Sequence, residues 1–194
     1  MKFKVIGLIL VLIFSIKNYS QSRNEIRILY GFSDSELLRN VNLDGGGEHT
    51  TINFSEYGIK YLRQIKGNLK IETGLIFVSL SIGVNNINYE EPLVKTRFER
   101  LEIISVPFNL NYTFGNYFFV NGGPLIDFQT SKKPSDSQSG IGYDFGVGLK
   151  YEINRLVFFV NANYKRHAVI AFKKEKYHQK LTEVGVQFGL GYKY

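Results

Sequence analysis

Hydrophobic and polar residues alternate with a period of two along LTEVGVQFGLGYKY, residues 181–194. One set of alternate positions, from Val184 to Tyr194, is apolar and rich in aromatic residues, and the other carries glycine and charge, as at Glu183 and Lys193. A strand sends successive side chains to opposite faces. The segment therefore predicts a long strand with one face suited to lipid and the other suited to the interior of a closed barrel.

Seven further segments show the same alternation, over residues 25–32, 52–64, 69–82, 97–114, 117–128, 141–152 and 156–166. Tight turns at Lys66–Asn68, Gly115–Asn116 and Asn154–Arg155 alternate with long loops, which puts all the long loops at one end of a meander. Outer-membrane barrels have this asymmetry. We therefore predict an all-β fold, an eight-stranded antiparallel up-and-down transmembrane β-barrel located in the cell outer membrane.

The apolar positions change parity inside segment 97–114. Leu101 and Ile103 share one parity, whereas the apolar residues from Ile104 onward occupy the other. One extra residue near Ile103–Ser105 would reconcile the two sets, so the sequence predicts a β-bulge there. Pro107 is compatible with a local loss of strand pairing.

The first residues form a separate unit. Lys2 and Lys4 precede an apolar run over residues 5–16 that is too short to cross a bilayer as a helix. This pattern is typical of a secretory signal peptide, with a short buried N-terminal helix as the alternative. We predict a signal peptide over residues 1–21, cleaved near Ser20–Ser22, and a barrel domain over residues 22–194.

Composition excludes several other classes of protein. Without residues 1–21, the chain has 21 basic and 17 acidic residues, an excess too small to indicate nucleic-acid binding. The chain has no cysteine, so it has no disulfides and no thiol for a lipid anchor. The remaining alternative is a soluble eight-stranded ligand barrel whose apolar face points inward. Glycines concentrated on the polar parity favour the membrane barrel, because they suit a narrow interior.

The stretch LEIISVPFNLNYTFGNYFFVNGGPLIDF, residues 101–128, carries a family resemblance. Glu102, Pro107 and the pair Gly123–Pro124 match the "LEIP…LKY…G…F…GP" core of the PorT-like outer-membrane β-barrel proteins of Bacteroidetes, which this stretch resembles. The resemblance implies an outer-membrane barrel. The name-giving member is tied to type IX secretion, a role that the resemblance does not by itself extend to this chain.

Charged residues on the polar parity are predicted to face the barrel interior. An eight-stranded barrel is just wide enough to be filled by side chains, so these charges are expected to pair and plug the interior, with a narrow charged channel as the alternative. The central members of this predicted network are Arg27, Glu56, Lys60, Glu72, Asp144, Lys150 and Glu183, and further inward charges are Glu25, Lys70, Asp127, Glu152, Lys165 and Lys193.

All three histidines, His49, His167 and His178, fall in predicted surface loops. His49 with Asp44 and Ser55 resembles the residue types used by membrane-embedded hydrolases, but no motif joins them. The sequence therefore predicts no catalytic residues, no metal site and no cofactor. Gly45–Gly47 lacks the lysine and hydroxyl residue of a phosphate-binding loop and is expected to be a loop tip.

A basic group at the fourth long loop is the candidate contact with lipopolysaccharide phosphates, because clustered Lys and Arg beside a membrane bind anionic head groups. Its members are Lys165, Arg166, Lys173, Lys174 and Lys176. The other expected partners are outer-membrane lipid, the barrel-assembly machinery through the C-terminal strand, and an envelope protein. The predicted function is envelope-structural or loop-mediated interaction, with a secretion-system accessory or a transporter of small or apolar solutes as alternatives.

Overall fold

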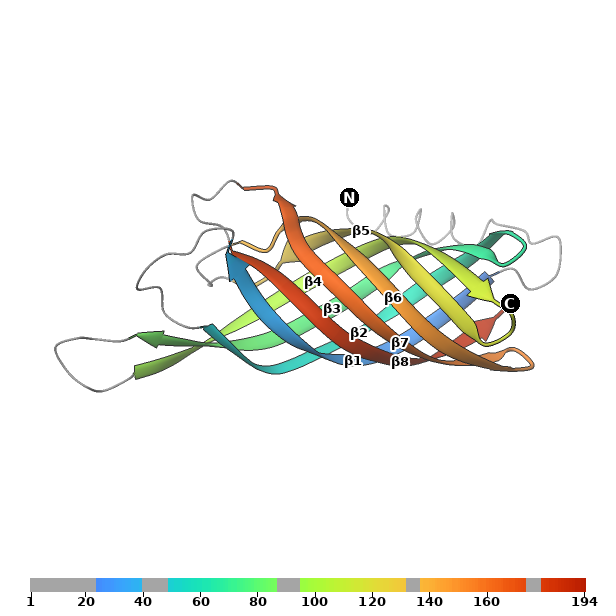
Figure 1. The fold of residues 1–194 in the computed structure, drawn as a ribbon, viewed down its shortest axis with the longest axis horizontal. Coiled ribbons are helices and arrows are strands. Elements are labelled where there is room, and N and C mark those ends of the chain that lie inside the picture. The colour runs from blue at the N-terminus through green and yellow to red at the C-terminus, as the bar shows by residue number, and fades with distance from the viewer. Residues whose placement is uncertain (1–23, 40–48, 87–94, 132–136, 174–178) are drawn as a thin grey trace, which may run out of the picture.

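A computed structural model describes residues 24–39, 49–86, 95–131, 137–173 and 179–194. Within these ranges the chain forms eight antiparallel strands that close into one barrel (Figure 1). The strands are β1 (Asn24–Arg39), β2 (His49–Lys66), β3 (Leu69–Asn86), β4 (Lys95–Phe114), β5 (Phe118–Gln129), β6 (Gly140–Ile153), β7 (Leu156–Ala171) and β8 (Gln179–Lys193). Each strand pairs with its neighbour in the chain, and β8 pairs with β1. The predicted fold class is confirmed.

The three predicted tight turns are confirmed. Gly67 and Gly115 have φ of 53° and 59°, and Asn154 has φ of 55°, the left-handed conformation that glycine and asparagine adopt most readily. These turns lie at the same end of the barrel as Asn24 and Tyr194, where the Tyr194 N–H donates to the Asn24 carbonyl at 3.0 Å (Figure 1). We call this end the turn end and the opposite end the loop end.

Several strands extend beyond their predicted bounds at the loop end. The first strand was predicted to end at residue 32, with a long loop after it. β1 instead pairs with β8 as far as Arg39↔Gln179, so Ser33 and Glu36 lie in a strand. Backbone hydrogen bonding between neighbours continues where the apolar alternation has already stopped. The predicted signal peptide and the Gly45–Gly47 tip lie outside the described residues.

The predicted β-bulge near Ile103–Ser105 is absent from β4. The register with β3 is the same at Thr73↔Phe108 and Ile76↔Ser105. Inward residues also follow one another at every second position, which places Leu101 and Ile103 inside the barrel with Ser105. The parity of the apolar residues changes because the interior itself becomes apolar toward the loop end. Within the described pairings, register shifts occur instead at 52/55 and 64/66 in β2, and in β7 between Arg166 and Ile170, which pair with Tyr143 and Ile141 of β6.

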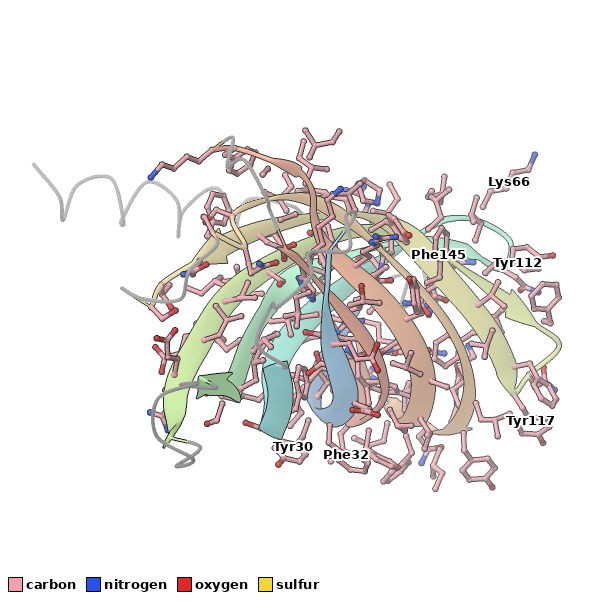
Figure 2. The ribbon with its side chains drawn as sticks, turned by 60° about the vertical axis from the view of Figure 1, so that its left-hand side comes forward. Tyr30, Phe32, Lys66, Tyr112, Tyr117 and Phe145 are labelled. Atoms are coloured by element: carbon pink, nitrogen blue, oxygen red, sulfur yellow. The ribbon has the colours of Figure 1, made fainter. Side chains whose placement is uncertain are left out.

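The outer surface is covered by exposed apolar side chains, as the alternation predicts. Phe118 is 62% exposed and Val147 is 61% exposed. Figure 2 shows Tyr30 and Phe32 on the outside of β1 and Tyr117 near the turn end. Exposed aromatic rings at this end include the stacked pair Tyr117–Tyr151, with ring centroids 6.3 Å apart. A band of apolar residues with aromatic rings at its edge is typical of a barrel in lipid.

Candidate functional site

The barrel interior is the candidate site, because it gathers nearly all the buried charge. Its side chains form four groups along the axis, defined here from the turn end upward. The mouth cluster is Glu25, Arg27, Lys70, Lys150, Glu152 and Lys193; the central cluster is Lys60, Glu72, Asn109, Asn111, Asn121 and Asp144; the upper cluster is Glu56, Asp127, Lys165, His167, Glu183 and Gln187; the apolar plug is Ile76, Val78, Leu80, Leu101, Ile103 and Leu181.

The mouth cluster rests on a buried arginine. Arg27 Nε lies 2.5 Å from Glu25 Oε1, and its guanidinium carbon lies 5.4 and 4.7 Å from the ring centroids of Phe119 and Phe159. The positive guanidinium is therefore held by a carboxylate and by two aromatic faces. Lys70 Nζ binds the other oxygen of Glu25 at 2.6 Å.

The rest of the mouth cluster shares a second carboxylate. Lys150 Nζ lies 2.8 Å from Glu152 Oε1, and Lys193 binds the other oxygen of Glu152. Each carboxylate at this end thus serves two cations.

The central cluster pairs charges with asparagine amides. Lys60 Nζ donates to Glu72 Oε1 at 2.8 Å, and the Asn111 amide donates to Glu72 Oε2 at 3.0 Å. Asn109 donates to both oxygens of Asp144, at 3.1 and 3.0 Å. Buried ionised groups need such partners, because an isolated charge in an apolar interior is strongly unfavourable.

The upper cluster is centred on two cations from β7. Lys165 binds Glu56, and its Nζ also lies 3.4 Å from Glu183 Oε2. His167 Nδ1 lies 3.0 Å from Asp127 Oδ2, and its Nε2 lies 3.0 Å from Glu183 Oε1. A carboxylate at each ring nitrogen is the arrangement that an imidazolium satisfies, since it carries an N–H on both nitrogens.

The apolar plug lies between the upper cluster and the loop end. Its six residues come from β3, β4 and β8 and pack together with Phe54. Beside it, the Gln138 side chain accepts the Leu181 N–H at 3.0 Å. The interior is therefore closed at this level by packed side chains among the described residues.

The structure places all seven central members of the predicted interior network inside the barrel. Arg27, Glu56, Lys60, Glu72, Asp144, Lys150 and Glu183 are buried and carry ion pairs or hydrogen bonds.

The residues predicted to contact lipopolysaccharide head groups do not share one location. Lys165 is 1% exposed and belongs to the upper cluster, so its assignment to the lipopolysaccharide contact is wrong: alternation continues through it and directs it inward. Arg166 is half-buried and Lys173 is exposed. Lys174 and Lys176 lie outside the described residues.

The predicted surface position of His167 is also wrong. His167 is fully buried in β7. The predicted loop position of His49 is wrong as well, because β2 begins at His49 and pairs it with Val84, although its side chain lies outside the described side chains. His178 lies outside the described residues. Ala168 has φ of 45°, so His167 and Ala168 both turn inward and the alternation is interrupted. His167 nevertheless shares the parity of Asn163 and Lys165, and extending that parity by one step would have found it.

Chemically, the buried charged side chains of the described interior are arranged as ion pairs and hydrogen-bonded carboxylates. No group of three or more His, Cys, Asp and Glu in the described ranges has the arrangement of a metal site. Nor does any helix there have the length and apolarity needed to cross a membrane.

The eight strands close into a barrel with an apolar, aromatic exterior and a charged interior. These features define a small β-barrel of the outer-membrane type. The family described as "Outer membrane protein beta-barrel domain" matches residues 6–194, and the chain belongs to this family. The protein is located in the outer membrane.

Solved structures give the same fold at low identity. The outer membrane protein OprG from Pseudomonas aeruginosa superposes with a TM-score of 0.60 and 12% identity, over 90% of this chain and 97% of OprG. The outer membrane protein AlkL, determined in DMPC lipid bilayers, gives a TM-score of 0.55 and 13% identity, over 92% of this chain and 93% of AlkL. No curated protein sequence matches the chain. These likenesses establish the architecture alone.

Proposed function

We propose that this protein is a non-conducting, non-enzymatic outer-membrane barrel that contributes structurally to the envelope. The filled interior is the observation that carries the proposal. Three clusters of paired charges and the apolar plug follow one another along the axis. A solute crossing the barrel would have to break buried ion pairs such as Lys60–Glu72 and displace packed residues such as Leu101.

The contacts of the buried histidine support the non-enzymatic part of the proposal. Both ring nitrogens of His167 face carboxylates, at 3.0 Å each. The nearby Ser105 hydroxyl donates to Asp127 at 2.6 Å. In a hydrolase of the Ser-His type, the hydroxyl would instead bond to the imidazole that removes its proton.

Conductance in planar lipid bilayers tests the proposal. We expect the purified barrel to insert without unitary current steps. A matched variant with Leu101→Ala and Leu181→Ala has a thinner apolar plug. Current through this variant would show that the barrel inserts under these conditions and that the plug is the barrier to conduction. Reproducible current steps from the unaltered protein would overturn the non-conducting role.

Two contacts at the membrane surface remain proposals. Lys173 is exposed beyond β7, and with Lys174 and Lys176 it would attract lipopolysaccharide phosphates. The apolar, aromatic outer face of β8 is the segment that we expect the barrel-assembly machinery to bind. Binding of the Lys173→Gln variant to lipopolysaccharide-containing vesicles, compared with the unaltered protein, tests the first contact.

The resemblance of residues 101–128 to PorT-like proteins of Bacteroidetes favours one second candidate, an accessory role in a secretion system of the type IX kind. In that case the loop end would present the partner surface. Co-purification with components of a secretion translocon, lost when the loops are shortened, would support this role. The transporter alternative is supported by one observation. Among the described residues β1 and β2 pair only from Asn24↔Arg63 to Gly31↔Glu56, although β1 continues to Arg39 and β2 begins at His49, so their loop-end parts are not paired with each other.

Export by a signal peptide over residues 1–21 also stays part of the proposal. N-terminal sequencing of the protein extracted from outer membranes tests it, and a first residue near Ser20–Ser22 is expected.

A further inference from the structure

The turn end of the barrel opens into a polar pocket of about 490 Å³. Two of the three turns, at Gly67–Asn68 and Gly115–Asn116, contribute to its wall, and the mouth cluster contributes its charge. The lining residues are Gln64, Gly67, Asn68, Lys70, Thr113, Gly115, Asn116, Tyr117, Lys150, Tyr151, Glu152 and Lys193. We call it the mouth pocket.

The mouth pocket has more cations than anions among its described side chains. Its lining carries Lys70, Lys150 and Lys193 against Glu152. With Arg27 and Glu25, which Lys70 contacts, the mouth cluster contains four basic groups against two carboxylates. Each carboxylate is already shared between two cations, so an excess of two positive charges remains. Lys150 and Lys193 each bind one carboxylate among the described residues, although an ammonium has three N–H donors.

The rim of the same end adds to this excess. Arg63, Lys66 and Arg155 are exposed at or beside the turns, and Figure 2 shows Lys66 projecting away from the barrel wall. Clustered charge of one sign in a concave site raises the local concentration of counter-ions. Amide and hydroxyl groups of Asn68, Asn116 and Thr113 line the pocket beside the lysines.

The interior above the mouth pocket has the opposite balance. The central and upper clusters contain five carboxylates against Lys60, Lys165 and His167, so they repel an anion even with the imidazole charged. Arg27, packed on Phe119 and Phe159, shares the Glu25 carboxylate with Lys70 of the pocket wall. An anion is thus attracted to the mouth pocket and stopped there.

We propose that the mouth pocket binds an oxyanion of the phosphate class with at least two negative charges, held by Lys70, Lys150 and Lys193. The anion supplies the negative charge that Glu25 and Glu152 leave missing. Its source is either a soluble phosphate compound or the phosphomonoester head group of an inner-leaflet lipid, and the pocket recognises the same group in both.

Calorimetric titration of inorganic pyrophosphate into the full barrel in phosphatidylcholine nanodiscs tests the proposal. We expect saturable binding that Lys193→Gln weakens about fivefold, because it removes one unit charge beside the anion. Glu152→Gln should act in the opposite direction and tighten binding about fivefold. It should also increase the thermal stabilisation that pyrophosphate gives, since the lysines then lack their shared carboxylate.

Arg100→Gln, an exposed cation in the loop-end half of β4, is the matched control and should leave pyrophosphate binding unchanged. Repeating the titration in nanodiscs that contain phosphatidic acid, a phosphomonoester lipid, distinguishes the sources: competition by the lipid identifies the head group, and undiminished binding identifies the soluble anion. The proposal is overturned by the absence of saturable binding, by an equal loss in Arg100→Gln, or by Glu152→Gln and Lys193→Gln shifting affinity in the same direction.

Discussion

His167 Nδ1 lies 3.0 Å from Asp127 Oδ2, so a contact inside the barrel joins β7 to β5 across the intervening β6. The other ring nitrogen lies 3.0 Å from Glu183 in β8. One imidazole therefore links three strands near the loop end. All three side chains are fully buried, which makes this link a strong test of how the interior stabilises the barrel.

Replacing His167 by alanine should destabilise the barrel strongly. Asp127 and Glu183 would each lose a buried partner, and breaking a buried ion pair by removing one side chain costs about 3–5 kcal/mol. The free energy of unfolding is measured by urea titration in phosphatidylcholine vesicles, with the mobility of the unboiled protein in SDS gels reporting the folded fraction.

Lys173→Ala is the matched control for this measurement, because Lys173 is exposed just after the same strand. It should change the free energy of unfolding by no more than about 0.5 kcal/mol. An equally small effect of His167→Ala would show that the three-strand link does not stabilise the barrel.

Lys165 and Glu56 should be energetically coupled. Lys165→Met and Glu56→Gln each leave a charge buried without its partner, whereas the double variant removes both. We expect a coupling energy of about 1–3 kcal/mol in a double-mutant cycle. The Arg100–Glu102 pair, at 3.8 Å and solvent-exposed, should give about 0.5 kcal/mol or less in the same assay. Equal coupling energies for the two pairs would contradict the role given to burial.

The alternation of side chains predicted the eight strands, because every strand of a membrane barrel meets the same requirement of lipid outside and a narrow interior inside. It also predicted which charges point inward, since parity alone decides that. Which charges pair could not be predicted. Gln187 donates to Glu56 at 3.0 Å across 131 residues of sequence, and only the closed barrel brings them together.

Two predictions were wrong because the pattern changes near the loop end. The predicted β-bulge rested on an interior that is polar throughout, whereas Leu101 and Ile103 fill the apolar plug. His167 was missed because the predicted strand ended at Arg166, one residue too early. The clear alternation does stop there, since His167 and Ala168 are consecutive inward residues.

Gly146 should be required by the asparagines around it. A Cβ at this position would lie 2.5 Å from Asn121 Oδ1 and 2.6 Å from Asn161 Oδ1. Gly146→Ala should therefore cost about 1–3 kcal/mol of overpacking. Adding Asn161→Ala should recover part of that loss, compared with Asn161→Ala alone in the same urea titration. Strictly additive effects would contradict the proposed crowding.

Arginine on the outer surface should destabilise the barrel according to its depth in the membrane. Val147 lies midway along β6 and is 61% exposed, whereas Ile153 ends the same strand and is 48% exposed. In lipid vesicles we expect Val147→Arg to cost about 2–4 kcal/mol and Ile153→Arg at most about 1 kcal/mol, because the cost of a charge falls from the bilayer midplane to the interface. Water on the outer face would make both changes nearly neutral, so equal small effects would contradict lipid contact along β6.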